Sequence, residues 1–198
     1  MFQEGSVNRI DEIVHKIRRE ISKVAEDFDS TTEDLIKFIS VSDRESYNSV
    51  IDSLYLLEDT QLAKNSFSTE SLSNEEFGRL YLLYYGVLNS CYMQQQSILV
   101  ICNKLGIRKN ISEIKSSKVV SYRNDFSAHS SNRGRGQSEH SYILDRFAMK
   151  AGKVKGYSSN HKDGEIFKEA SIYELIKNWD GLLERQLELV SDRILANK

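Results

Sequence analysis

An arginine and a histidine lie close together at a point where a predicted helix ends. The segment Ser121 to Ser130 reads SYRNDFSAHS and holds Arg123, the polar residue Asn124 and His129. A guanidinium is permanently charged, and its planar fork matches the oxygens of a phosphate. An imidazole takes up or releases a proton near neutral pH. These types and this spacing suit chemistry at a phosphodiester, with Arg123, Asn124 and His129 as the catalytic residues.

The spacing alone does not select this pair. An arginine followed by a histidine after four to six intervening residues occurs four times, at Arg9/His15, Arg123/His129, Arg133/His140 and Arg135/His140. The first pair lies within an amphipathic helix, and the last two lie in a glycine-rich stretch with no rigid element to hold them. Only Arg123 starts in a helix, is followed directly by a polar residue and comes soon after the most apolar helix.

Apolar residues at helical spacing predict a mainly α protein, and the chain contains no proline to interrupt its helices. We expect helices over about 7–28, 77–105, 111–128 and from 171 onward, with two more that begin near Ser30 and Ser42. Capping-box patterns at Ser30, Ser42, Ser73 and Ser171 mark helix starts. The polar stretch 60–72 precedes the central helix, and Gly106 is predicted as the end of that helix.

A change of composition at about 140–170 predicts a small β insertion. Five of the ten glycines fall between Gly134 and Gly164, and β-branched and aromatic residues appear among lysine-rich turns. Asp163-Gly164 is a favourable pair for a hairpin turn. We therefore predict one helical domain over 1–198, with a β-hairpin or three-stranded meander inserted at about 140–170, before its last helix.

The charge is unevenly distributed along the chain. The 27 basic and 29 acidic residues leave a net charge of -2, yet the stretch 118–168 has ten basic and five acidic residues. That stretch therefore has a net charge of +5 and the remainder -7, which favours a local anion-binding surface over a uniformly basic protein. Substrate-binding residues for a phosphate backbone are predicted at Arg133, Arg135, Lys150, Lys153 and Lys155, with Tyr142 or Tyr157 available to stack on bases.

The sequence also limits other classes of function. Cys91 and Cys102 are about 16 Å apart along one predicted helix, too far to form a disulfide. Free thiols, together with the lack of a signal core or a membrane-length apolar run, favour a cytoplasmic protein that does not enter a membrane. No metal-ligand spacing, phosphate loop or nucleophile elbow is found, so no metal or cofactor is expected.

The motif and its surroundings resemble the HEPN superfamily, whose members carry an arginine, a polar residue and, within four to six positions, a histidine. Arg123, Asn124 and His129 match this pattern. The helix 82–105, the motif helix and the closing helix resemble the family's all-helical bundle. The β insertion departs from its minimal fold.

The resemblance implies a metal-independent endoribonuclease, often a homodimer that brings two motifs to one groove. It implies attack of a ribose 2′-hydroxyl on the adjacent phosphorus, with a 2′,3′-cyclic phosphate and a 5′-hydroxyl as products. It also implies a toxin or anti-phage role, with a cognate antitoxin as a partner. In an uninterrupted helix Arg123 and His129 would lie roughly 120° apart. Either the helix ends near Ala128 or two chains complete one site.

Other interpretations of the same residues stay open at this point. His129 could cap the carbonyls of a helix end while Arg123 pairs with Asp125 or another acid. The alternative function is a non-catalytic, dimeric HEPN-like module that binds RNA or a protein. A third alternative is an interaction scaffold without nucleic acid, in which the basic segment is spread over opposing surfaces.

Overall fold

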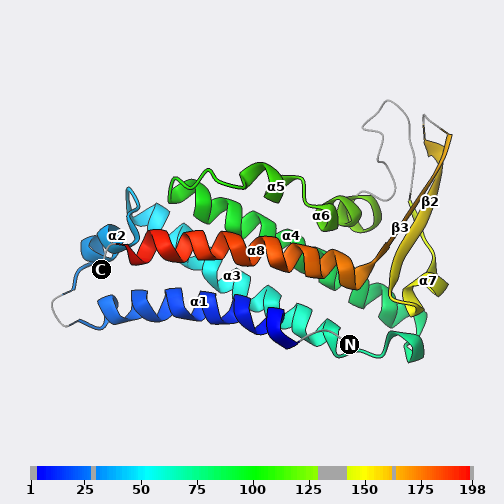
Figure 1. The fold of residues 1–198 in the computed structure, drawn as a ribbon, viewed down its shortest axis with the longest axis horizontal. Coiled ribbons are helices and arrows are strands. Elements are labelled where there is room, and N and C mark those ends of the chain that lie inside the picture. Colours follow the sequence, from blue (N-terminus) through cyan, green and yellow to red (C-terminus); the bar gives the residue numbers. More distant parts are fainter. Residues whose placement is uncertain (1–3, 28–29, 129–141, 162–163, 197–198) are drawn as a thin grey trace.

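The computed structural model describes residues 4–27, 30–128, 142–161 and 164–196. Most of these residues are helical, and a three-stranded antiparallel sheet precedes the last helix. The predicted mainly α class with a small β insertion is therefore confirmed. Figure 1 shows long helices lying lengthwise, with the sheet at one end of the bundle and α2 at the other.

Long helices form the body of the molecule. They are α1 (Glu4–Ala25), α3 (Arg44–Ser68), α4 (Phe77–Lys104) and α8 (Ile172–Leu195). The α3 and α4 helices pack along each other, and α8 packs along α1 and α4. The short α2 (Thr32–Ile39) contacts α1 and α3, while α5 (Ile111–Lys115) and α6 (Lys118–Arg123) lie on α4.

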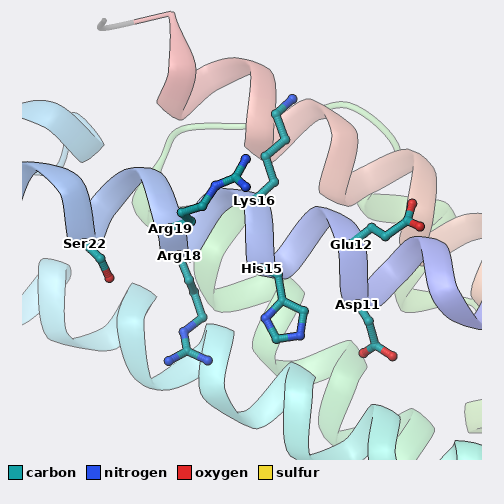
Figure 2. Close-up of a pocket in the computed structure, with 7 residues that line it drawn as sticks. All are labelled: Asp11, Glu12, His15, Lys16, Arg18, Arg19 and Ser22. Carbon is teal, nitrogen blue, oxygen red and sulfur yellow. The ribbon is translucent and has the colours of Figure 1, made fainter.

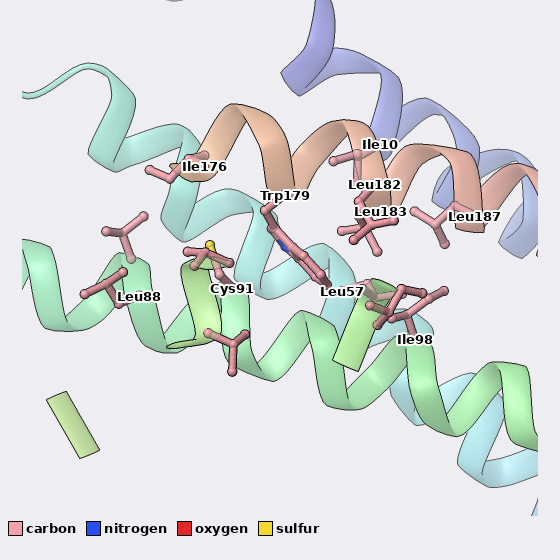
Figure 3. Close-up of a cluster of buried hydrophobic side chains, with 14 of the residues drawn as sticks. Ile10, Leu57, Leu88, Cys91, Ile98, Ile176, Trp179, Leu182, Leu183 and Leu187 are labelled. Carbon is pink, nitrogen blue, oxygen red and sulfur yellow. The ribbon is translucent and has the colours of Figure 1, made fainter. Parts of the chain in front are cut away.

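Buried apolar side chains from these helices form one continuous core. Figure 3 shows Trp179 of α8 extending toward α4, between Cys91 and Ile98, with Leu57 of α3 close by. Cys91 and Cys102 are both free and buried, so the expectation of unpaired thiols is confirmed. None of the helices in the described ranges combines the length and hydrophobicity needed to cross a membrane.

A polar network lies inside this apolar core. The Lys64 ammonium donates to Gln61 Oε1 at 3.0 Å, to Gln94 Oε1 at 3.0 Å and to Asp180 Oδ1. Trp179 Nε1 also donates to Gln94 Oε1, at 2.8 Å. Lys64 and Asp180 are buried, and their ion pair links α3 to α8 through the centre of the bundle.

This network accounts for a polar stretch inside a helix. The polar residues of 60–72 precede the predicted central helix in the sequence, and α3 continues into them as far as Ser68. Gln61 and Lys64 are buried because their polar groups find partners on α4 and α8, so their polarity does not indicate solvent exposure.

The helix starts were predicted with mixed success. Ser171 accepts from Glu174 N and caps α8, as predicted. The caps of α2 and α3 lie one residue after the predicted Ser30 and Ser42, because Thr31 forms a capping box with Asp34 and Asp43 accepts from Ser46 N. The pattern at Ser73 was wrong, because residues Leu72–Asn74 form a 3-10 turn and α4 begins only at Phe77. Gly106 adopts a positive φ of 69° just after α4, as a helix-ending glycine does.

The single helix predicted over 111–128 is instead divided in three. α5 ends at Lys115, α6 covers Lys118–Arg123, and a π-helical turn covers Asn124–Ala128. The Gln95 side chain of α4 donates to Ile114 O at 2.7 Å and to Ser117 Oγ at 3.2 Å. The break between α5 and α6 is stabilised because the Gln95 amide donates a hydrogen bond to a carbonyl at the end of α5.

The sheet is a meander. The strand β1 (Ile143–Leu144) pairs with β2 (Lys153–His161), which pairs with β3 (Gly164–Ser171), and α7 (Arg146–Lys150) lies between the first two strands. The predicted turn residue Asp163 falls outside the described residues. Ser171 both ends β3 and caps α8, so the sheet is joined directly to the bundle.

Candidate functional site

Arg123, the last residue of α6, is held by neutral groups. Its Nε donates to Asn89 Oδ1 of α4 at 2.9 Å, and its Nη1 donates to Asn124 Oδ1 at 3.1 Å. Its guanidinium carbon lies 4.0 Å from the centre of the Tyr92 ring. A cation on an aromatic face is attracted by the ring quadrupole. Three uncharged partners thus fix the direction of a half-buried guanidinium.

No carboxylate in the described part of the chain forms an ion pair with Arg123. The neighbouring acid Asp125 is buried and pairs with Lys168 of β3. Burial by itself would lower the pKa of Lys168, but the hydrogen bond and charge of Asp125 outweigh it and raise that pKa. The open alternative in which Asp125 neutralises Arg123 therefore does not describe this arrangement.

The residues on both sides of Arg123 are anchored to the sheet. The Tyr122 hydroxyl donates to Glu169 O at 2.9 Å, and the buried Phe126 ring packs 5.4 Å from that of Tyr142. A Cβ at Gly156 would overlap the Phe126 ring, so a glycine permits this close approach. The sheet thus supports the motif from behind, as a rigid site requires.

The backbone between Arg123 and the position of His129 has an unusual form. Residues Asn124–Ala128 make a π-helical turn that begins directly after α6. Such turns are rare, and they are found frequently at functional sites. His129 lies outside the described residues, so its predicted role stays a prediction.

The other predicted site residues belong to different surroundings. Arg133 and Arg135 also lie outside the described ranges. Lys153 and Lys155 both pair with Glu169 across the outer face of the sheet, at 2.6 and 3.6 Å, and the Lys150 ammonium lies 5.1 Å from the centre of the Phe77 ring. The described contacts join these lysines to β3 and to the start of α4, and none joins them to Arg123.

One predicted base-stacking residue was wrong. Tyr142 is buried, with its ring against Phe126 and below the Lys168 ammonium, which lies 5.2 Å from the ring centre. It faces the bundle because it precedes the short strand β1, whose alternation sends Leu144 inward as well. Tyr157 is 41% exposed and remains available.

Asn89 and Tyr92 were not predicted as site residues. They lie three positions apart on α4, beside the end of α6, and both contact Arg123 directly. Asn89 is one of several polar residues of α4, such as Ser90 and Gln94, so its type alone does not single it out. Nothing in the local sequence connects Tyr92 with a residue 31 positions later.

The competing pair Arg9 and His15 has a different environment. Arg9 forms ion pairs with Glu184 at 2.8 Å and Glu188 at 2.7 Å, and His15 Nδ1 lies 3.1 Å from Glu58 Oε1. The guanidinium of this pair is thus already neutralised by two acids of α8, unlike that of Arg123.

A hollow of about 700 Å³ lies beside His15, and Figure 2 shows that all seven lining residues come from α1. Asp11, His15 and Arg18 extend toward α3, whereas Glu12 and Lys16 extend the other way. Arg18 pairs with Glu58. A single helix whose side chains diverge, with Arg18 and Arg19 each beside a carboxylate, offers no convergent site for an anion.

Within the described ranges, no three His, Cys, Asp or Glu side chains come together as a metal site would require. Comparisons of the chain with protein-family models, with curated proteins and with solved structures gave no match. The case for a function therefore depends on the residues themselves.

Proposed function

We propose that this protein is a HEPN-like, metal-independent endoribonuclease in which Arg123 binds the reacting phosphate and His129 transfers protons. One observation carries the proposal: the half-buried Arg123 guanidinium is oriented by Asn89, Asn124 and Tyr92 and is paired with no described carboxylate. A cation that is positioned but not neutralised keeps its charge for an anionic ligand, and its fork suits phosphate.

The chemistry follows from these roles. The ribose 2′-oxygen bonds to phosphorus as its proton passes to a base, and the bond from phosphorus to the 5′-oxygen breaks as that oxygen gains a proton. His129 provides the transfer, typically worth about 10²- to 10⁴-fold in rate. Arg123 stabilises the charge on the phosphoryl oxygens, and Asn124 holds the guanidinium. The products are a 2′,3′-cyclic phosphate and a 5′-hydroxyl.

The proposal includes a homodimer through the exposed face of α4. Leu82, Tyr85, Met93 and Val100 are 74, 37, 38 and 38% exposed, which is unusual for large apolar residues on a helix. Leu82, Tyr85 and Met93 recur at spacings that place them on one face with Asn89, which contacts Arg123. A second copy packed on this face would bring two Arg123 residues toward one groove.

A cleavage assay tests the catalytic proposal. Purified protein is incubated with a labelled single-stranded RNA in EDTA, and the 2′,3′-cyclic ends are quantified. We expect His129→Ala to lose at least about 100-fold in rate, because proton transfer is removed. His15→Ala is the matched control and should cleave like wild type. Equal rates for His129→Ala and wild type, or loss of wild-type cleavage in EDTA, contradict the scheme.

A second experiment tests the homodimer. Leu82→Asp places a charge on the α4 face and should give monomers in sedimentation-velocity runs, because a buried unpaired charge is costly. Leu62→Asp, at a 60% exposed leucine of α3, is the matched control and should leave the mass unchanged. A monomeric wild type would remove the dimer from the proposal.

The proposed biological setting is a toxin or anti-phage system with a cognate antitoxin. Expression of the wild type should then arrest growth, and Arg123→Ala should relieve the arrest. Growth arrest that persists in Arg123→Ala cells would separate toxicity from the site.

The same geometry favours one other function. Arg123 donates from Nε to Asn89 and from Nη1 to Asn124, so part of its guanidinium can still bind a ligand. Such binding does not require that a reaction follows. A non-catalytic dimeric module that binds RNA or a protein would use it in this way. RNA binding that needs Arg123, with no cleavage by wild type, would select this alternative.

A further inference from the structure

The outer face of the sheet is more apolar than a solvent-facing surface requires. Phe147 is 71% exposed, Phe167 69%, Ile143 53% and Tyr157 41%. Along β2, Val154, Gly156 and Ser158 are buried toward the bundle while Lys153, Lys155 and Tyr157 face outward. The exposed aromatic residues are therefore on the face of the sheet opposite to the one that packs on Phe126.

The rings on this face form a small platform. Tyr157 and Phe167 are direct partners in the β2–β3 register, and their ring centres lie 6.0 Å apart with 31° between the planes. Phe147 of α7 is held edge-on against Phe77, with ring centres 5.3 Å apart. Between Phe147 and the two strands lies a hollow of about 300 Å³, whose lining includes Ile143.

Cations surround the platform. Lys153 and Lys155 share the single carboxylate of Glu169. Arg146 and Lys150 of α7 lie 5.5 and 5.1 Å from the centre of the Phe77 ring and form no ion pair with a described carboxylate. Asp145 accepts from the Phe147 and Ala148 N–H groups as the cap of α7. Among the side chains that the structure describes on this face and on α7, four cations thus accompany the two acids Glu169 and Asp145.

We infer that this face, formed by Phe147, Tyr157, Phe167 and their neighbouring cations, binds single-stranded nucleic acid by stacking its bases. Exposed rings bordered by Lys and Arg match the two parts of an unpaired strand, its base faces and its phosphates. Bases in a duplex already stack on one another and cannot reach these rings. A neutral apolar peptide would leave the excess positive charge unmatched.

This surface is separate from Arg123, and its inference does not require cleavage. The sheet lies between the two, because its inner face contacts Phe126 and Asp125 through Gly156 and Lys168. A strand on the outer face therefore leaves Arg123 open. If the protein is a ribonuclease, the surface selects single-stranded substrates; if it is not, the surface still binds them.

Fluorescence anisotropy with a labelled 12-nucleotide RNA at low salt tests the inference. All proteins carry Arg123→Ala, so that no cleavage interferes and failure of the nuclease proposal does not affect the result. Adding Phe147→Ala and Phe167→Ala should raise Kd at least about 10-fold, because stacking on each ring is lost. Both rings are largely exposed, so circular dichroism should show an intact fold.

Leu62→Ala removes a similarly exposed apolar side chain from α3 and should leave Kd unchanged. A blunt RNA duplex should bind more weakly than the single strand, and binding of the single strand should weaken as salt rises. Equal Kd values with and without Phe147 and Phe167, or no binding of the single strand at low salt, would overturn the inference.

Discussion

The buried ion pair between Lys64 and Asp180 allows a quantitative prediction. Replacing Lys64 with Met removes the only described partner of the Asp180 carboxylate, because Oδ1 bonds to Lys64 and Oδ2 has no hydrogen bond. Replacing Asp180 with Asn is milder, since Lys64 keeps Gln61 and Gln94 as acceptors and gains an amide oxygen of the same shape.

The exposures set the expected magnitudes. The side chains of Lys64 and Asp180 are 2 and 1% exposed, so water cannot solvate a charge left alone. Breaking such a pair costs about 3–5 kcal/mol. We expect Lys64→Met to lie near the upper end of this range and Asp180→Asn near the lower end. The double variant buries no lone charge, so it should be about 2–3 kcal/mol more stable than the sum of the two losses predicts.

Urea unfolding followed by circular dichroism at 222 nm gives the four free energies of this cycle. The control is the surface pair Arg185 and Glu113, whose side chains are 56 and 58% exposed. A cycle with Arg185→Met and Glu113→Gln should give a coupling below about 1 kcal/mol. Additivity within about 0.5 kcal/mol for Lys64 and Asp180 would show that the two charges are not coupled, and would refute the reasoning.

Three further predictions concern the support of the site and the core. Gly156→Ala should destabilise the protein by roughly 1–3 kcal/mol in urea, because its Cβ overlaps Phe126 and Ile143 O, whereas Gly78→Ala meets nothing within 4 Å and should cost no stability. Burial raises the pKa of the Cys91 thiol to about 12, so iodoacetamide at pH 8 should alkylate it only after unfolding; rapid alkylation of the native protein would contradict this.

The hydrogen bonds from Ser42 and from Ser46 N lower the pKa of Asp43 from 3.8 to about 2. This cap therefore stabilises the fold fully above about pH 4 and loses its effect as the pH falls through 2, so Asp43→Asn should reduce the change in unfolding free energy between pH 4 and 2. If the unfolding free energy of Asp43→Asn changed between pH 4 and 2 as much as that of the wild type, this expectation would be contradicted.

Local patterns predicted the elements of the fold better than their ends. The helical period of the apolar residues was enough to predict the long helices, and the glycines and β-branched residues of 140–170 were enough to predict the sheet. The continuation of α3 through Lys64 was not predictable, because the partners of that lysine on α4 and α8 are 30 and 116 positions away. The break at Ser117 likewise depends on a distant glutamine, Gln95.

The surroundings of the candidate site could not be predicted from the local sequence. The types and spacing of Arg123 and His129 indicated phosphate chemistry, but the absence of a neutralising acid at Arg123 follows from tertiary contacts. Asp125 is adjacent in sequence to Asn124 yet pairs with Lys168, 43 positions later. Tyr142 and Tyr157 looked alike in the sequence, and only the register of the sheet places one inside and the other outside.

The central claim is that Arg123 is a positioned, unneutralised cation that stabilises the reacting phosphate of RNA. The most direct measurement is the rate at which 2′,3′-cyclic phosphate ends form in EDTA with Arg123→Lys, compared with Arg9→Lys. A lysine keeps the charge but loses the planar fork, so Arg123→Lys should be slower by about 100-fold or more, while Arg9→Lys should match wild type. Equal rates for Arg123→Lys and Arg9→Lys would contradict the claim.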